Sequence, residues 1–253
     1  MNDRPLILVT NDDGVDAKGI KQLIEVMRFF GDVVVVAPDH PMSGMSVAIT
    51  VDKPLRVKKL KEEAGYIKYQ TNGTPVDCVK LAFNQLLDRY PDFVVSGINH
   101  GANSSISVMY SGTMGAVIEG CLHGVPSIGF SLCDYDPDAD FAKAKIYVAR
   151  VFQQVAENGL PPFVCLNVNF PKGEIKGIKV TRQTAGKWVE EYDRRTDPHS
   201  RDYFWLTGHF KNFEPEVEGT DLNALDNQYV SVVPVNIDLS CYQTIETMKN
   251  WKF

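Results

Sequence analysis

The stretch from Leu6 to Gly14, LILVTNDDG, joins an apolar run to two adjacent acids. The run Leu6–Thr10 is apolar and rich in branched residues, which is typical of a buried β-strand. Asp12 and Asp13 follow it directly, and two neighbouring carboxylates disfavour each other's ionisation. A divalent cation bound by oxygen ligands is the simplest partner for such a pair. The stretch therefore predicts a strand that ends at a cation site.

The rest of the first half alternates apolar runs with helical patterns. Val33–Ala37 is apolar throughout its first four positions, as expected for a parallel strand covered on both faces. Apolar residues in Gly19–Phe29 recur at the spacing of an amphipathic helix. Similar patterns predict strands at Phe93–Ser96, Ser127–Ser131 and Phe163–Val168, and helices at Pro75–Arg89, Thr113–His123 and Phe141–Glu157. This order predicts an α/β fold with a doubly wound, mostly parallel sheet and helices on both faces.

The pattern changes near Lys179, which divides the chain into a catalytic core, 1–180, and a C-terminal part, 181–253. Within the second part, Gly186–Gly208 alternates around the turn Thr196–His199 and predicts a long β-hairpin. The hairpin is rich in aromatic residues. We expect it to make an oligomer contact rather than to fold back onto its own core, because a long aromatic ribbon is unfavourable in water.

Composition narrows the class of protein. The 253 residues carry a formal net charge of −6, which argues against a broad nucleic-acid interface. No apolar run approaches the roughly 18 residues of a membrane helix, and no signal-peptide pattern is visible, so we expect no membrane partner. The five cysteines form no CxxC pair. Reduced thiols in a cytoplasmic protein are the expected interpretation.

Polar loops follow three of the expected strands. In a parallel sheet the carboxyl ends of the strands share one edge, so these loops are predicted to converge. Ser43 follows the second strand and Asn99 the third, and with Asp12 and Asp13 they supply two carboxylates, an amide and a hydroxyl. Such a set suits Mg²⁺, Mn²⁺ or Ca²⁺ rather than zinc. Taken singly, each of these residues is also explained as a turn or helix-cap residue.

A fourth loop, Tyr110–Gly115, precedes the helix that ends near His123. Its Ser111, Gly112 and Thr113 predict either a phosphate site at a helix N-terminus or simple N-capping. No GxGxxG or Walker A sequence is present, so a dinucleotide or NTPase site lacks its fingerprint. His40 and His100 lie in the loops as well, where a histidine is more often exposed than catalytic.

Several motifs together resemble the survival protein SurE family. The resemblance covers nearly the whole chain in order and rests on TNDDG, APDHPMSGMS, NGTPVDCV, VVSGINHGAN, YSGTMGAVIEG, DPHSRDYFWLTG and GTDLNALDNQYVSVVPV. One departure is Asn227-Gln228, where relatives commonly carry a glycine before Tyr229. That departure lies far from the acidic loop and concerns a turn in the C-terminal part.

The resemblance implies a Rossmann-like core and a divalent-metal-dependent phosphatase that releases nucleoside and phosphate from nucleoside monophosphates. It implies a 5′-nucleotidase and leaves open whether 3′-phosphates are cleaved as well. Carried over residue by residue, it places one Mg²⁺ or Mn²⁺ per subunit on Asp12, Asp13, Ser43 and Asn99, and phosphate on Asn11, Ser111, Gly112 and Thr113. It also implies a C-terminal extension exchanged within homodimers or homotetramers.

The expected mechanism is attack of a cation-activated water on the phosphomonoester, with Asp12 and Asn11 as the catalytic residues. Asp12 would hold the ion, and Asn11 would stabilise charge on the phosphoryl oxygens. Two alternatives stay open from the residues alone. Asp12 could instead form an aspartyl-phosphate, or the chain could be a non-catalytic nucleotide sensor that uses the same anion site.

Overall fold

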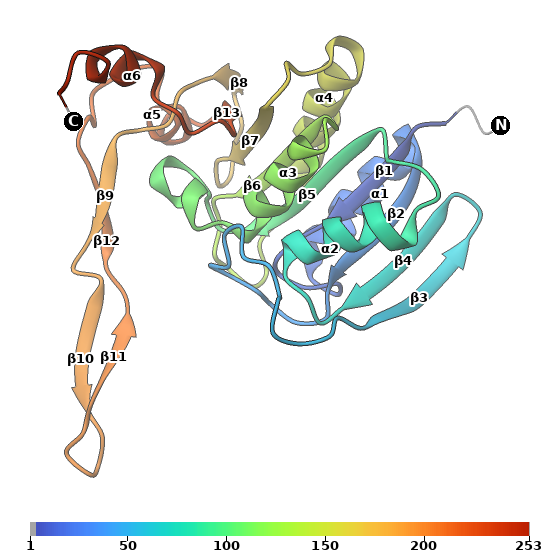
Figure 1. Cartoon of the computed structure of the whole chain (residues 1–253), viewed down its shortest axis with the longest axis horizontal. Coiled ribbons are helices and arrows are strands. Elements are labelled where there is room, and N and C mark those ends of the chain that lie inside the picture. The colour runs from blue at the N-terminus through green and yellow to red at the C-terminus, as the bar shows by residue number, and fades with distance from the viewer. Residues whose placement is uncertain (1–3, 253) are drawn as a thin grey trace.

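The computed structural model describes residues 4–252, and its centre is a nine-stranded sheet (Figure 1). From one edge to the other the strands are β3 (Val57–Glu63), β4 (Tyr66–Thr71), β2 (Asp32–Pro38), β1 (Leu6–Thr10), β5 (Phe93–His100), β6 (Ser127–Leu132), β7 (Val164–Phe170), β13 (Tyr229–Asn236) and β8 (Gly177–Val180). The six strands from β4 to β7 are parallel, whereas β3 is antiparallel to β4 and β13 to β7. The predicted α/β sheet is confirmed.

Helices cover both faces of the sheet. Helices α1 (Lys18–Phe30) and α4 (Ala142–Asn158) pack on one face, and α2 (Pro75–Leu81) and α3 (Gly112–Leu122) pack on the other. Strand β1 shows why both faces are apolar: Ile7 and Val9 join the core under α1 and α4, while Leu8 joins the core under α2 and α3. Successive strand residues point to opposite faces, so a strand covered twice must be apolar throughout.

The order of the strands reverses beside β1. From β1 the chain passes to β2 and β4 on one side of the sheet and later to β5, β6 and β7 on the other. Ligands of open α/β sheets bind outside the carboxyl ends of the strands at such a reversal. Asp12 and Asp13 follow β1 here, so the fold places the acidic pair at this point.

Two predicted boundaries were wrong. Strand β5 does not end at Ser96 but resumes after an irregularity at Gly97, whose φ of +124° takes the chain out of register. Asn99 therefore lies in the strand, opposite Ser131 of β6, and not in a loop. The helix predicted for Pro75–Arg89 ends early, because α2 passes into a wider π-helical turn, η1 (Ala82–Leu86).

Four strands were not predicted, namely β3, β4, β8 and β13, and the edge strand β3 shows the reason. All seven residues of β3, VKKLKEE, are exposed, so the apolar alternation that indicates a strand is absent. Charged side chains on an edge strand are a common protection against pairing with another chain. Strands β8 and β13 were missed as well, and β13 returns the C-terminal part to the main sheet, which thus takes strands from both sides of residue 180.

The predicted hairpin is present and slightly longer than expected. Its inner half pairs β9 (Gly186–Val189) with β12 (His209–Asn212), and its outer half pairs β10 (Tyr192–Thr196) with β11 (Asp202–Leu206). Figure 1 shows it extending away from the sheet, not folded back over it. Several side chains of the outer half are more than half exposed: Tyr192, Phe204, Trp205 and Leu206.

The departure at Asn227-Gln228 lies at a special backbone position. Helix α5 (Asp221–Asp226) ends there, and Gln228 has a φ of +68° immediately before β13 begins. This left-handed conformation favours glycine, because any other side chain is crowded by the backbone. Gln228 is thus a strained turn residue, well removed from the acidic loop. The chain closes with α6 (Tyr242–Met248). In the described part of the chain, no helix is long and apolar enough to cross a membrane.

Candidate active site

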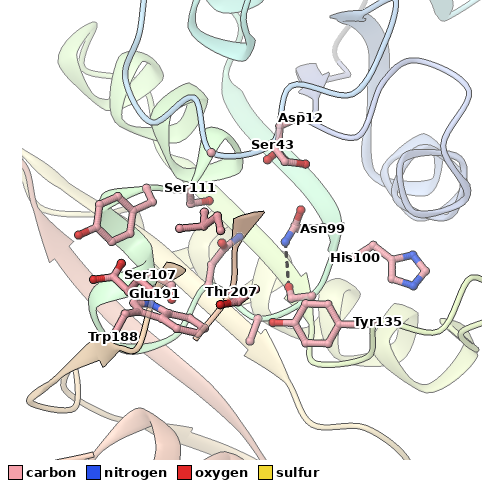
Figure 2. Close-up of a pocket in the computed structure, with 16 residues that line it drawn as sticks. Asp12, Ser43, Asn99, His100, Ser107, Ser111, Tyr135, Trp188, Glu191 and Thr207 are labelled. Carbon is pink, nitrogen blue, oxygen red and sulfur yellow. Dashed lines mark hydrogen bonds between the residues drawn. The ribbon is translucent and has the colours of Figure 1, made fainter. Parts of the chain in front are cut away.

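The carboxyl edge of the sheet opens into a cavity of about 700 Å³. Figure 2 shows Asp12, Ser43, Asn99 and Ser111 together on its wall, as the sequence predicts. They come from the turn after β1, the loop after β2, strand β5 and the start of α3. Asn11, Asp13, Gly112 and Thr113 lie just behind that wall. The predicted residues therefore form one cluster, although only half of them line the cavity.

Asp12 is a buried acid, only 4% exposed. Its Oδ1 accepts a hydrogen bond of 2.5 Å from the Thr113 hydroxyl. Burial raises the pKa of Asp12 to about 6; the Thr113 hydrogen bond opposes this rise, and the Asp13 carboxylate adds to it. Holding a charge in this place costs free energy that a nearby cation would offset.

Asp13 is only partly buried, and its Oδ2 accepts from the backbone N–H of His100 at 3.1 Å. Burial raises the pKa of Asp13 too, while the His100 amide opposes the rise. This bond ties the end of β1 to the end of β5. The two acids therefore sit in different surroundings, one held by α3 and the other by β5.

Asn11 is fully buried and shapes the acidic turn. Its Nδ2 donates to the Gly14 carbonyl at 2.9 Å, and its Oδ1 is buried with no hydrogen-bond partner. The bond to Gly14 uses one of the two N–H groups of the Asn11 amide and closes the turn after β1. The structure thus gives the Asn11 side chain the role of bracing the turn that carries Asp12 and Asp13.

Ser43 is exposed in a long loop that backbone hydrogen bonds hold in place on either side of it, at Met42 and Ser46. The Met42 N–H donates to the Asp12 carbonyl at 2.7 Å, and the Ser46 N–H donates to the Tyr110 carbonyl at 3.1 Å. These two backbone bonds hold the loop between the acidic turn and the start of α3. Ser43 consequently lines the same cavity as Asp12 without being buried.

The Asn99 side chain has a fixed orientation. Its Nδ2 donates to the Gly101 carbonyl at 2.8 Å, which turns its Oδ1 in the opposite direction. Figure 2 shows that oxygen directed towards Asp12 and Ser43. The amide therefore presents an acceptor, and not a donor, to the acidic end of the cavity.

The start of α3 faces the same point. Ser111 is the N-cap, and its hydroxyl accepts from the Met114 N–H at 3.1 Å. Gly112 packs against Asp12 so closely that a Cβ at this position would lie 2.8 Å from the Asp12 Cβ. The Thr113 hydroxyl is committed to Asp12. N-capping by Ser111 is thus present, and the free amides at the start of a helix still favour an anion beside it.

The donors present fit a hard divalent cation. Two carboxylates, an amide oxygen and a hydroxyl converge, and oxygen ligands are those that Mg²⁺ and Mn²⁺ prefer. Among residues 4–252, no three His, Cys, Asp or Glu side chains cluster in a way that could hold a metal. The candidate donors Asp12, Asp13, Ser43 and Asn99 include no His or Cys, the ligands that zinc prefers, so their chemistry does not resemble a zinc centre.

Neither loop histidine faces Asp12. The Nδ1 of His40 lies 2.5 Å from Asp39 on the surface. His100 borders the cavity, and Figure 2 shows its ring directed away from Asp12. The ring contacts the Asp136 carbonyl and the Phe141 ring. Both rings are thus engaged by neighbours other than Asp12.

The cavity also has walls that the sequence did not predict. Tyr135 and Asn103 border it from loops, and the hairpin adds Trp188, Glu191, Leu206 and Thr207. The aromatic content of the hairpin was the available signal, and it was interpreted only as a subunit contact. Sequence spacing gives no indication that Trp188 approaches the same cavity as Asp12.

Known proteins of one family are similar to this chain over most of its length. A family model described as survival protein SurE matches residues 7–190. A protein named 5′-nucleotidase SurE from Phocaeicola vulgatus is 51% identical over 250 residues, covering 98% of this chain and 97% of the relative. One of the same name from Bacteroides fragilis is 52% identical over 252 residues, 99% of each. The crystal structure of the SurE protein from Aquifex aeolicus superposes with a TM-score of 0.83 at 37% identity, covering 97% of this chain and 98% of that one.

Proposed function

The chain belongs to the survival protein SurE family, and from that premise we infer that it is a 5′-nucleotidase. Such an enzyme is a phosphoric monoester hydrolase that converts nucleoside monophosphates to nucleoside and inorganic phosphate. The full-length likeness to relatives named for this activity carries the assignment. The acid-lined cavity at the reversal of strand order supports it, because open α/β sheets bind their ligands there.

We further propose that one Mg²⁺ or Mn²⁺ per chain binds to Asp12, Asp13, Ser43 and Asn99. The fixed Asn99 oxygen and the buried charge of Asp12 support this ligand set. When bound, such an ion polarises a phosphoryl oxygen and lowers the pKa of a water molecule. In this proposal Asp12 is the principal catalytic residue, and Thr113 holds its carboxylate in place.

The phosphate group is proposed to lie between these acids and the start of α3. Ser111 lines the cavity there, and the Gly112 and Thr113 amides begin the helix. A helix N-terminus carries partial positive charge, which stabilises the extra negative charge of a phosphoryl-transfer transition state. Asn11 contributes by bracing the turn beneath Asp12, through its bond to Gly14.

Phosphate release tests the enzyme and its metal together. The purified chain is expected to release phosphate from nucleoside 5′-monophosphates, to lose this activity by about 100-fold or more in excess EDTA, and to regain it with Mg²⁺ or Mn²⁺. A panel of 5′- and 3′-nucleotides with each metal would define the substrate range. Nucleotide binding without any phosphate release, at every metal tested, would instead identify a non-catalytic sensor.

We also propose that the outer hairpin joins copies of the chain into a homodimer or homotetramer. The exposed aromatic side chains of β10 and β11 support this, because an unpaired apolar ribbon is unfavourable in water. Light scattering after size-exclusion chromatography is expected to show an oligomer, and Phe204→Ser with Trp205→Ser should shift it towards the monomer. An unmodified chain that elutes as a monomer at micromolar concentration would contradict the proposal.

All five cysteines are free thiols, which supports a cytoplasmic location.

A further inference from the structure

The cavity has two chemically different ends. Asp12, Ser43, Asn99 and Ser111 form the polar end, as described above. The root of the hairpin, defined here as 184–191 with 206–212, forms part of the other end through Trp188, Glu191, Leu206 and Thr207 (Figure 2). A cavity of about 700 Å³ is far larger than one phosphate group requires. The second end is therefore available to the organic part of a phosphomonoester.

Trp188 offers a braced aromatic surface to that end. Its side chain is partly buried, and its ring meets the Phe210 ring edge to face, with the centroids 6.2 Å apart. Phe210 lies opposite Trp188 in the paired strands β9 and β12. An indole held in this way can stack on any nucleobase, because every base has a π-face.

Asp221 connects the hairpin root to the rest of the cavity wall. It is only 1% exposed, and its Oδ2 accepts from the Ser105 N–H at 2.6 Å. Its Oδ1 accepts from the Thr184 N–H at 3.0 Å and from the Thr184 hydroxyl at 2.5 Å. Ser105 begins the short helix η2 (Ser105–Met109), which carries Ser107 of the cavity wall and leads to Ser111. Thr184 is the first residue of the hairpin root.

One buried carboxylate thus fixes two walls that are far apart in the sequence. A second bond, from the Ser105 hydroxyl to the Thr184 carbonyl at 2.8 Å, joins the same two segments directly. Charge-assisted hydrogen bonds are the strong ones, and a buried carboxylate with several donors holds them firmly. The distance from the polar end to Trp188 depends on this junction.

We propose that the hairpin root is the nucleoside-binding wall, with Trp188 as the base-stacking residue and Asp221 as the positioning residue that fixes this wall relative to the phosphate end. The inference rests on the proposed nucleotidase function and assigns recognition of the nucleobase within it. The inference predicts that Trp188 and Asp221 both contribute to recognition of the nucleobase and that Asp221 contributes through Trp188.

The test compares adenosine 5′-monophosphate with ribose 5-phosphate, which has the same sugar phosphate but no base. The ratio of kcat/KM for the two substrates is expected to fall about tenfold in Trp188→Ala, mainly through a higher KM for the nucleotide. The ratio should fall by several-fold in Asp221→Asn, because the new amide group cannot accept from both Ser105 and Thr184. Trp251→Ala and Asp226→Asn, which repeat each change outside the cavity, are expected to keep the ratio of the unmodified chain.

A double variant of Trp188 and Asp221 separates a positioning effect on Trp188 from a general loss of structure. If Asp221 acts by placing Trp188, adding Asp221→Asn to Trp188→Ala should lower the ratio by less than twofold further. Thr184→Val removes the hydroxyl bond to Asp221 and the bond that this hydroxyl accepts from the Leu222 N–H, but it keeps the backbone bond from Thr184 to Asp221. It serves as the milder variant if thermal unfolding shows that Asp221→Asn is poorly folded.

Equal losses with both substrates, or an unchanged ratio in Trp188→Ala, would overturn the inference. Absence of phosphate release from both substrates in the unmodified chain would instead contradict the proposed function.

Discussion

Asp12→Asn is expected to lower kcat for nucleoside monophosphates by about 1,000-fold or more, since it removes the charge at the centre of the site. The fold should survive this change. Asparagine has the shape of aspartate and can still accept from the Thr113 hydroxyl, which now bonds to Asp12. Because burial raises the pKa of Asp12 to about 6, the neutral amide also relieves an unfavourable buried charge. The midpoint of thermal unfolding without metal should therefore be equal to or above that of the unmodified chain.

Phosphate release and thermal unfolding, measured side by side, check this expectation. Asp16→Asn is the matched control, because Asp16 lies in the same loop and its side chain is 82% exposed. Activity within tenfold of the unmodified chain in Asp12→Asn would contradict the central role of this residue.

The same variant also separates the two roles proposed for Asp12. A ligand role predicts that Mn²⁺ binding, measured by calorimetry, weakens strongly in Asp12→Asn. A nucleophile would be indicated by retained Mn²⁺ binding together with solvent ¹⁸O entering the Asp12 carboxylate during turnover of the unmodified chain.

Gly19→Ala is expected to lower the free energy of unfolding by about 3 kcal/mol, although alanine is the better helix former. Gly19 lies in the first turn of α1, where the helix crosses β5. A Cβ at this position would lie 1.9 Å from the Ile98 carbonyl oxygen, which is a backbone atom and cannot rotate away. The helix or the strand must move, and Asn99 follows Ile98 directly. Activity is therefore expected to fall together with stability.

Urea unfolding and phosphate release measure the two effects. Lys21→Ala, on an exposed part of the same helix, is the control and should change the free energy of unfolding by less than about 0.5 kcal/mol. A Gly19→Ala chain as stable as the unmodified one would show that α1 and β5 separate easily at this contact.

The apolar strands could be predicted because their signal is local. In Leu6–Thr10 and Val33–Ala37, burial on both faces leaves a continuous apolar run that any reader of the sequence can see. The group of residues at the polar end of the cavity could be predicted for the same reason, since Asp12 and Ser43 lie in the segments that follow such strands. Asn99 lines the same cavity as Asp12, but it was predicted to lie in a loop. Gly97 is typical of a strand end, and only the pairing with β6 shows that the strand continues to His100.

The sequence by itself determined the parallel sheet, the helices on both faces and the group of oxygen donors at one edge. The strands and helices follow from side-chain periodicity, which depends on residues close together in the sequence. The group of oxygen donors follows from the rule that ligands bind outside the carboxyl ends of parallel strands. Only the tertiary structure decided that Trp188 borders the cavity of Asp12 and that Asp221 joins Ser105 to Thr184. Such contacts link segments about 40 to 180 residues apart, and their free energy comes from burial and hydrogen bonding that exist only after the chain has folded.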